Sequence, residues 1–217
     1  MGKLNRRGAT RSRVRPALGS VVRSHIAAVL LASSAMLACQ DRAGVEDDAV
    51  VLDQWTMLGH DYASSYANPG EGRISVENAH ELDQLWEFEA RGQVYSTPVV
   101  VDGVVYISST GGLYAFDGTT GDILWETTGF GATSSLAYDE GILYSHDFGA
   151  MLRALDAATG EELWKTKTDT HALAAGTSSP IVFERYVIVG LSSNEIVREG
   201  ATFRGGVAAF DKHTGEQ

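Results

Sequence analysis

The 217-residue sequence contains a single cysteine, Cys39. One thiol cannot form a disulfide within the chain, and the sequence has no Cys-x-x-Cys-His motif for covalent attachment of haem. The sequence also lacks a long apolar segment. Its longest candidate, residues 26–37, is shorter than the roughly 20 apolar residues that a membrane-spanning helix needs. These absences argue against a disulfide scaffold, a cysteine metal site, a bound c-type haem and an integral membrane protein.

Residues 1–38 have the composition of a signal peptide. They contain seven Lys or Arg residues and no acidic residue, and they end with the apolar stretch 26–37. Cys39 follows Met36-Leu37-Ala38, which resembles the lipobox of bacterial lipoproteins. We therefore expect a lipoprotein-type signal peptide over residues 1–38 and lipidation of Cys39. Ordinary signal-peptide cleavage nearby and an uncleaved anchor are the alternatives.

Basic residues are scarce after the leader. Seven of the 17 basic residues lie in the leader, so 10 remain against 28 acidic residues, a net charge of −18. Such a surface repels phosphate backbones, which argues against nucleic acid as a partner. Residues 39–54 include Glu46-Asp47-Asp48 and are predicted to form an acidic, solvated tether.

The rest of the chain is repetitive. Trp86, Trp125 and Trp164 are separated by equal intervals, and the last two end near-copies of one phrase, Ala-x-Asp-x-x-Thr-Gly-x-x-x-Trp. The phrase starts again at Ala209, where it stops before the tryptophan. A fixed period of about 40 residues predicts a β-propeller built from repeated blades. The third copy comes later than this period predicts, and the additional residues fall around 192–206. Long loops confined to one repeat often carry function.

Each repeat is predicted to form a four-stranded antiparallel blade. Asp102-Gly103 favours a type I′ hairpin turn. The predicted strands are 96–101, 104–108, 112–116 and 123–127 in the first repeat, and 134–137, 142–145, 151–155 and 162–165 in the second. A ring of seven or eight blades needs about 270 to 320 residues at this period. Residues 55–217 are therefore expected to form about half of a ring.

The repeated residues have a structural interpretation. The glycines of the Thr-Gly pairs are expected to supply a positive φ, and the tryptophans are expected to pack between neighbouring blades. The small alanines are expected to leave room for the tryptophan rings. The glycines are Gly121, Gly160 and Gly215, and the alanines are Ala115, Ala154 and Ala209.

The repeated phrase resembles the tryptophan-docking motif of the pyrroloquinoline quinone (PQQ) repeat family. The segment from Trp55 to Trp86 is similar to the leading segment of quinoprotein alcohol dehydrogenases. A more specific similarity lies in residues 169–180, 187–195 and 202–205, in which the spacing from Thr177 to Ser192 and Glu195 matches the quinoprotein pattern. The Asp-x-His, Glu-loop and Phe-Arg-Gly elements together are similar to the polyvinyl-alcohol dehydrogenase branch.

The resemblance implies that Thr177 and the loop beginning at Ser192 lie at PQQ, and that Glu195 binds Ca²⁺. The chemistry of the side chains agrees with these roles. Asn194 and Glu195 offer the oxygen ligands that Ca²⁺ prefers. Hydroxyl groups could bond PQQ, and Arg204 could neutralise one of its carboxylates. The hydroxyl residues are Thr177, Ser192 and Ser193.

Each of these residues also has a purely structural alternative. The hydroxyl groups could satisfy backbone groups at strand ends, Glu195 could be a solvated loop acid, and Arg204 could pair with Glu195 or Glu199. Two features depart from the family pattern. Gly200-Ala201 stand where the polymer-oxidising branch has a Cys-Cys pair, and the catalytic aspartate of the family lies in blades beyond those seen here. The catalytic residue is therefore unknown.

The resemblance implies that the chain is the N-terminal part of a PQQ- and Ca²⁺-dependent alcohol dehydrogenase of the bacterial cell envelope. Its partners would be an alcohol and a cytochrome c or another electron acceptor. The main alternative is a non-catalytic, lipid-anchored PQQ-repeat propeller that binds proteins during outer-membrane assembly. The lipobox favours that alternative, whereas the spacing from Thr177 to Glu195 favours the enzyme. A degenerate PQQ-repeat protein is a third possibility, favoured by Gly200-Ala201.

Overall fold

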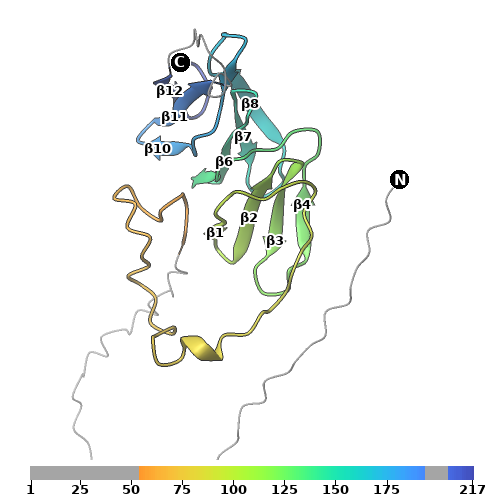
Figure 1. Ribbon diagram of the computed structural model, residues 1–217, viewed down its shortest axis with the longest axis vertical. Coiled ribbons are helices and arrows are strands. Elements are labelled where there is room, and N and C mark those ends of the chain that lie inside the picture. The colour runs from red at the N-terminus through yellow and green to blue at the C-terminus, as the bar shows by residue number, and fades with distance from the viewer. Residues whose placement is uncertain (1–53, 194–204) are drawn as a thin grey trace, which may run out of the picture. The chain divides into compact units, whose positions relative to one another are not determined.

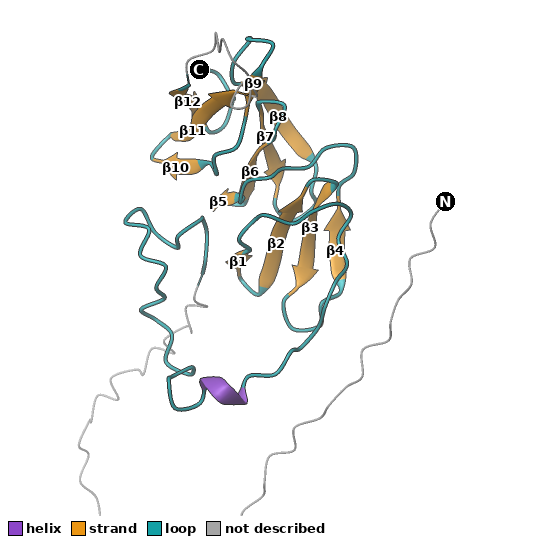
Figure 2. Cartoon of the chain, in the orientation of Figure 1, coloured by secondary structure: helices purple, strands orange, loops and turns teal. Residues whose placement is uncertain are grey.

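The computed structural model describes residues 54–193 and 205–217, and this part of the chain is an all-β structure (Figures 1 and 2). Its strands form three four-stranded sheets, in which every pairing is antiparallel. The one helix in the described ranges is a single 3-10 turn, η1 (Ala79–Glu81). Within these ranges no helix has the length and apolar character needed to span a bilayer. The predicted fold class is confirmed.

The first two sheets correspond to the two complete repeats. In each, the strands pair in sequence order, β1-β2-β3-β4 and β5-β6-β7-β8. The first sheet contains β1 (Val99–Val101), β2 (Val104–Ser109), β3 (Gly112–Asp117) and β4 (Ile123–Glu126). The second contains β5 (Ala137–Asp139), β6 (Ile142–His146), β7 (Met151–Asp156) and β8 (Glu162–Lys167). The predicted hairpin turn is also confirmed, since Asp102 and Gly103 have φ values of +48° and +79°.

Both first strands begin later than predicted, at Val99 instead of residue 96 and at Ala137 instead of residue 134. The reason is that the preceding residues use their polar groups differently. Ser134 Oγ donates to the backbone oxygen of His146 at 2.8 Å, and Ser135 N donates to Ser179 Oγ at 3.0 Å. These residues therefore bond through hydroxyl groups and not through a strand ladder.

The third sheet has a different arrangement. The long strand β11 (Tyr186–Ser193) pairs with β12 (Gly206–Asp211) along one edge. Its other edge is shared by β10 (Ile181–Phe183), which pairs with its beginning, and β9 (Ala174–Ala175), which pairs with its end. The two short strands together take the place that β1 and β5 hold in the other sheets.

Each repeat tryptophan docks on the turn of the following repeat. Trp125 Nε1 donates to the backbone oxygen of Ala157 at 2.9 Å, and Trp164 Nε1 donates to that of Lys212 at 3.1 Å. A Cβ atom added to Gly160 or Gly215 would lie within 3 Å of the tryptophan ring. The predicted packing between blades and the predicted positive φ of these glycines are confirmed, with φ values of +75° and +72°.

The alanines of the repeated phrase lie opposite the tryptophan of their own sheet. Ala115 pairs with Trp125, and Ala154 pairs with Trp164. Both alanines are buried, whereas Ala209 is exposed and pairs with Ile188. Space for each tryptophan on the neighbouring sheet is provided by the glycine, because a side chain there would meet the indole.

The hydrophobic core consists of two clusters, each between successive sheets. The first joins Tyr106 and Leu113 to Leu143 and Leu155, and the second joins Tyr144 and Leu152 to three residues of the third sheet, Val187, Val189 and Phe210. Leu113 and Leu152 are both 0% exposed, but Val207, at the equivalent position of the third sheet, is 76% exposed. The same repeat position is thus covered in two sheets and open in the third.

The leading segment, residues 54–68, contacts an outer strand of every sheet. Trp55 exchanges two backbone hydrogen bonds with Val100 of β1, at 2.8 and 2.9 Å. Tyr138 N of β5 donates to the backbone oxygen of Thr56 at 2.8 Å, and Tyr62 Oη donates to that of Val182 in β10 at 2.6 Å. One short segment therefore connects β1, β5 and β10. The predicted signal peptide, Cys39 and nearly all of the acidic tether lie outside the described residues.

Candidate cofactor site

A serine precedes each of the strands β1, β5 and β10 and bonds to the neighbouring strand of the same sheet. Ser96 Oγ donates to the backbone oxygen of Ser108 at 2.8 Å, and Ser134 Oγ donates to that of His146 at 2.8 Å. In the third repeat, Ser178 Oγ donates to the backbone oxygen of Gly190 at 3.1 Å and accepts from its N–H at 2.7 Å. In each of the three contacts the serine and its partner are 12 residues apart in the sequence, so the three serines occupy equivalent positions of the repeat.

The residue after each serine joins one sheet to the next. Thr97 N donates to Ser135 Oγ at 2.8 Å, and Ser135 N in turn donates to Ser179 Oγ at 3.0 Å. The residues that precede β1, β5 and β10 are therefore linked in that order by hydrogen bonds. The sequence analysis did not predict this series of hydrogen bonds between sheets. The pattern that could have indicated it is the recurring pair of hydroxyl residues, Ser96-Thr97, Ser134-Ser135 and Ser178-Ser179.

Thr177, the predicted PQQ contact, immediately precedes this fixed pair. Its side chain is exposed and lines a pocket of about 350 Å³. One wall of the pocket is formed by residues 177–181 and the other by the leading segment, including Asp61 and Tyr62. Asp61 is already engaged, since hydrogen bonds from the hydroxyl and backbone N–H of Ser65 lower the pKa of its carboxyl group. The hydroxyl of Thr177 is thus presented at a cavity large enough for a small molecule.

Ser192 and Ser193 lie beside the segment that carries Thr177. Ser192 pairs with Ala175 and Ser193 pairs with Ala174, in the antiparallel contact between β11 and β9. The bonds between Ser178 and Gly190 hold the same two segments together farther along. The structure therefore brings the backbone around Thr177 next to the backbone around Ser192, as the predicted site requires.

The remaining predicted site residues cannot be placed. Asn194, Glu195, Gly200-Ala201 and Arg204 lie outside the described residues. Leu191, before that stretch, pairs with Gly206, after it. The residues on both sides of the stretch therefore belong to the paired strands β11 and β12. Within the described part of the chain, no group of three or more His, Cys, Asp or Glu residues is close enough to hold a metal ion.

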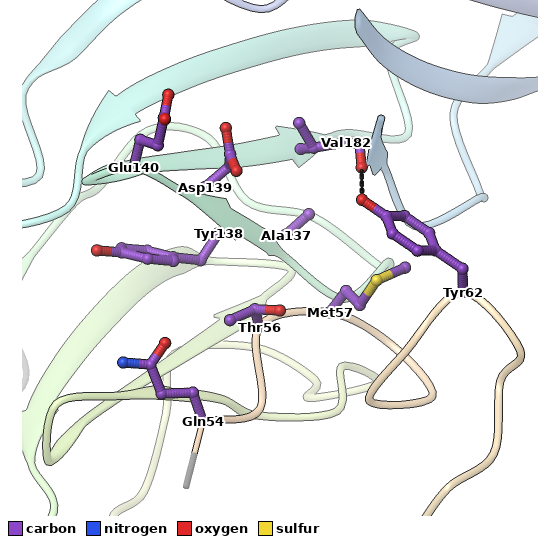
Figure 3. Close-up of a pocket in the computed structure, with 9 residues that line it drawn as sticks. All are labelled: Gln54, Thr56, Met57, Tyr62, Ala137, Tyr138, Asp139, Glu140 and Val182. Atoms are coloured by element: carbon purple, nitrogen blue, oxygen red, sulfur yellow. Dashed lines mark hydrogen bonds between the residues drawn. The ribbon is translucent and has the colours of Figure 1, made fainter. Parts of the chain in front are cut away.

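A second pocket, of about 230 Å³, lies between the leading segment and β5 (Figure 3). Asp139 and Glu140 contribute carboxylates to its rim, but Lys212 Nζ contacts them at 2.6 and 2.9 Å. The hydrogen bond and charge of Lys212 hold the pKa of Glu140 below its ordinary value. Because both acids are engaged in an ion pair, neither carboxylate is free to bind a cation in this pocket.

Hydroxyl groups at and near Thr177 suit the binding of a polar cofactor. Thr177 lines the pocket from the segment between β9 and β10, Ser192 and Ser193 lie on β11 where it pairs with β9, and none of these three hydroxyl residues is buried in the core. Hydroxyl groups of this kind can bond the carboxylates and carbonyl oxygens of a quinone. The described residues therefore fit one side of a PQQ site, whereas the metal ligands predicted for it belong to the stretch that is not described.

Comparison with known proteins places the chain among PQQ-repeat proteins. A PQQ-repeat family model described as "Outer membrane protein assembly factor BamB" matches residues 70–217. The chain is 31% identical over 192 residues to the quinohemoprotein alcohol dehydrogenase of Comamonas testosteroni, covering 80% of this chain and 26% of that protein. It is 28% identical over 185 residues to a polyvinylalcohol dehydrogenase of a Pseudomonas species, covering 78% of this chain and 29% of that protein.

The similarity extends to three dimensions. The crystal structure of the Comamonas testosteroni quinohemoprotein alcohol dehydrogenase matches with a TM-score of 0.66 at 29% identity, covering 76% of this chain and 26% of that one. The chain therefore spans between a quarter and a third of the length of these relatives.

Proposed function

The chain belongs to the PQQ-repeat family of β-propeller proteins, and we propose that it supplies the N-terminal blades of a PQQ- and Ca²⁺-dependent alcohol dehydrogenase of the bacterial cell envelope. Both relatives described above are alcohol dehydrogenases by name. The similarity to polyvinyl-alcohol dehydrogenases supports a place near that branch. The activity, the alcohol and the electron acceptor of the whole protein are all part of the proposal.

One observation carries the proposal, namely the pairing of the Thr177 segment with the end of β11. Ala175 lies opposite Ser192, and Ser178 Oγ bonds both backbone groups of Gly190. Two stretches that are separated along the chain are thereby held together, and one of them, residues 177–181, lines a cavity. The resemblance to quinoproteins assigns cofactor contacts to the same two stretches.

In this proposal Thr177, Ser192 and Ser193 hydrogen-bond PQQ, and Arg204 pairs with one of its carboxylates. Asn194 and Glu195 provide oxygen ligands to Ca²⁺. When bound, the quinone would supply the hydride acceptor, with Ca²⁺ as the Lewis acid that polarises it. The role of this chain is to bind and orient the cofactor. A cytochrome c or another acceptor would then take the electrons.

We also propose that the protein is exported and anchored by a lipid on Cys39. The support is the basic leader, its apolar stretch and the lipobox-like Met36-Leu37-Ala38 before the cysteine. The acidic residues 39–54 would then act as a tether between the membrane surface and the propeller.

The direct test is PQQ binding. The whole protein, with enough blades to close the ring, is titrated with PQQ in the presence of Ca²⁺, because the 217 residues alone are expected to be inactive. Binding is measured by equilibrium dialysis, with EGTA added in a parallel series. The proposal expects saturable binding that is lost with EGTA and weakened by Thr177→Ala. No binding at PQQ concentrations up to the millimolar range, or binding that Thr177→Ala and EGTA leave unchanged, would reject the assignment.

A second candidate is a protein-binding scaffold for outer-membrane assembly. The observation that favours it is the description of the matching family model, together with the lipobox-like sequence at Cys39. Such a protein needs neither PQQ nor Ca²⁺. Failure of the binding test combined with co-purification of outer-membrane assembly proteins would favour this function.

A further inference from the structure

His146 is a buried residue that the proposed site does not yet explain. It is 0% exposed and ends β6, where its backbone oxygen accepts the bond from Ser134. The equivalent residue of the first repeat is Ser108, whose backbone oxygen accepts from Ser96. Ser108 Oγ also donates to the backbone oxygen of Ser134 in the next repeat, at 2.6 Å. An imidazole therefore stands in the second repeat where the first has a small hydroxyl group that bonds the next sheet.

The imidazole lies directly against Gly176, in the segment between β9 and β10 that carries Thr177. A Cβ atom added to Gly176 would be 2.5 Å from His146 Nε2 and would also meet the backbone oxygen of Asp147. Only glycine fits so close to the ring without displacing it. Gly176 is the residue before Thr177, so any movement of His146 is transmitted to the backbone of the proposed cofactor contact.

The hydrogen bonding of His146 sets its protonation. Thr168 Oγ1 donates to the backbone oxygen of Ala150 at 3.0 Å, so at 3.2 Å it can only accept from His146 Nε2. This assigns the proton of the neutral ring to Nε2. Nδ1 is buried without a hydrogen-bond partner.

The surroundings of the ring favour the neutral form. Burial lowers the pKa of His146, and this outweighs the opposing effects of the Ser178 backbone and of Asp147. Asp147 is the adjacent charged group, and it is paired with Arg153 at 3.2 Å. Thr168, Gly176 and the backbone of Ser178, which also face the ring, carry no charge.

We propose that His146 is a positioning residue, which holds residues 174–178 in the conformation that presents Thr177 to the cofactor. What Thr177 contacts rests on the proposed function, but the support of its strand by His146 does not. The neutral imidazole fills the space behind Gly176 and is fixed by Thr168. Protonation places a charge in this buried position, so acid loosens residues 174–178 of the third repeat before it loosens the strands of the second sheet.

Hydrogen exchange followed by mass spectrometry tests the support directly. In His146→Leu, amides of residues 174–178 are expected to exchange about tenfold faster, because the polar anchor to Thr168 is lost. Amides of β2 and β3 should be unchanged. His146→Ser places the residue of the first repeat at this position and should restore part of the protection. His80→Leu is the matched control, since His80 is exposed and lies on η1.

The pH dependence separates positioning from simple packing. In the wild type, the protection of the amides of residues 174–178 against hydrogen exchange should fall as the pH drops below the ordinary histidine pKa. The rates are corrected for the pH dependence of intrinsic exchange. In His146→Leu and His146→Ser this protection should be independent of pH over the same range. Unchanged protection in His146→Leu, or an equal loss over all three sheets, would overturn the proposal.

PQQ binding in the presence of Ca²⁺ then connects the support to the site. His146→Leu is expected to weaken PQQ binding about tenfold at neutral pH. If the variant exchanges faster at residues 174–178 but binds PQQ as the wild type does, His146 does not position the site. If the wild type itself binds no PQQ, the proposed function fails, and the exchange results alone decide whether His146 supports the strand.

Discussion

The indole of Trp125 covers Gly160 of the following repeat. A Cβ atom on this glycine would lie 2.7 Å from the ring, and Trp125 Nε1 donates to the backbone oxygen of Ala157 in the same turn. Trp86 covers Gly121 and Trp164 covers Gly215 in the same way. The glycine is therefore required twice, for its positive φ and for its contact with the ring of the preceding repeat.

Gly160→Ala is expected to destabilise the protein by about 3 kcal/mol, because it adds strain at a positive φ and displaces the indole. Gly141→Ala is the matched control. Gly141 has φ +84° with nothing near the position of its Cβ atom, so this change should cost only about 1 kcal/mol. Urea unfolding of both variants measures the difference. Equal losses would show that the tryptophan contact adds nothing to the requirement for glycine.

Lys212→Met is expected to cost about 1 to 2 kcal/mol at neutral pH, because it leaves Asp139 and Glu140 without their partner. The loss should shrink in acid. The pKa of Glu140 is lowered in the folded protein, so its contribution is complete above its ordinary pKa and disappears as the pH falls through the lowered value. Thermal unfolding of the wild type and of Lys212→Met at pH 7 and pH 3 measures how the loss of stability depends on pH.

The control for that experiment is Lys165→Met, because Lys165 forms an exposed pair with Glu162 at 2.9 Å. Its stability should change by less than about 0.5 kcal/mol. A loss in Lys212→Met that is the same at both pH values would contradict a role for the carboxylates.

Glu195→Gln is expected to weaken Ca²⁺-dependent PQQ binding about 10- to 150-fold, the equivalent of roughly 1.5 to 3 kcal/mol for a charge-assisted contact. Thr177→Ala should have a smaller effect, since it removes a neutral hydrogen bond. Glu161→Gln, an exposed acid in the Thr-Gly turn, serves as the control. Dialysis with labelled Ca²⁺ and PQQ gives the affinities, and equal values for wild type and Glu195→Gln would reject the metal-site assignment.

Cys39→Ser is expected to move the protein from the detergent-rich phase to the aqueous phase, because it removes the site of lipid attachment. Phase partition of cell-envelope extracts, followed by immunoblotting, measures the distribution. Mass spectrometry of the wild-type N-terminus provides a second readout. An unmodified Cys39, or the same distribution for both proteins, would count against the anchor.

Much of the fold could be predicted from the sequence because the relevant interactions are local. The repeat period and the Asp102-Gly103 turn located the strands, and the Thr-Gly pairs located the turns with positive φ. The predicted starts of β1 and β5 were wrong. Their preceding serines and threonine bond to residues in other strands and sheets, and these contacts do not follow from strand propensity.

The candidate site was predictable only in part. The resemblance to quinoproteins selected Thr177, Ser192 and Ser193, and the structure pairs Ser192 and Ser193 with β9, which ends two residues before Thr177. Asn194, Glu195 and Arg204 remain predictions from that resemblance, as does Cys39 as the lipidation site. His146 was missed, since a histidine at the end of an apolar strand has no distinctive spacing. Its importance comes from Gly176, which contacts it from the next repeat.

The sequence by itself determined that the chain is a repeated all-β structure, since a fixed repeat period and short turns specify units that cannot bury their apolar faces alone. Only the tertiary structure decided which surfaces meet. Trp125 reaches the turn of the next sheet, Thr97 bonds Ser135, and β9 joins the end of β11 beside Thr177. These contacts depend on how successive sheets stack and twist against one another, and that geometry is set by the packing of whole sheets and not by any local pattern of residues.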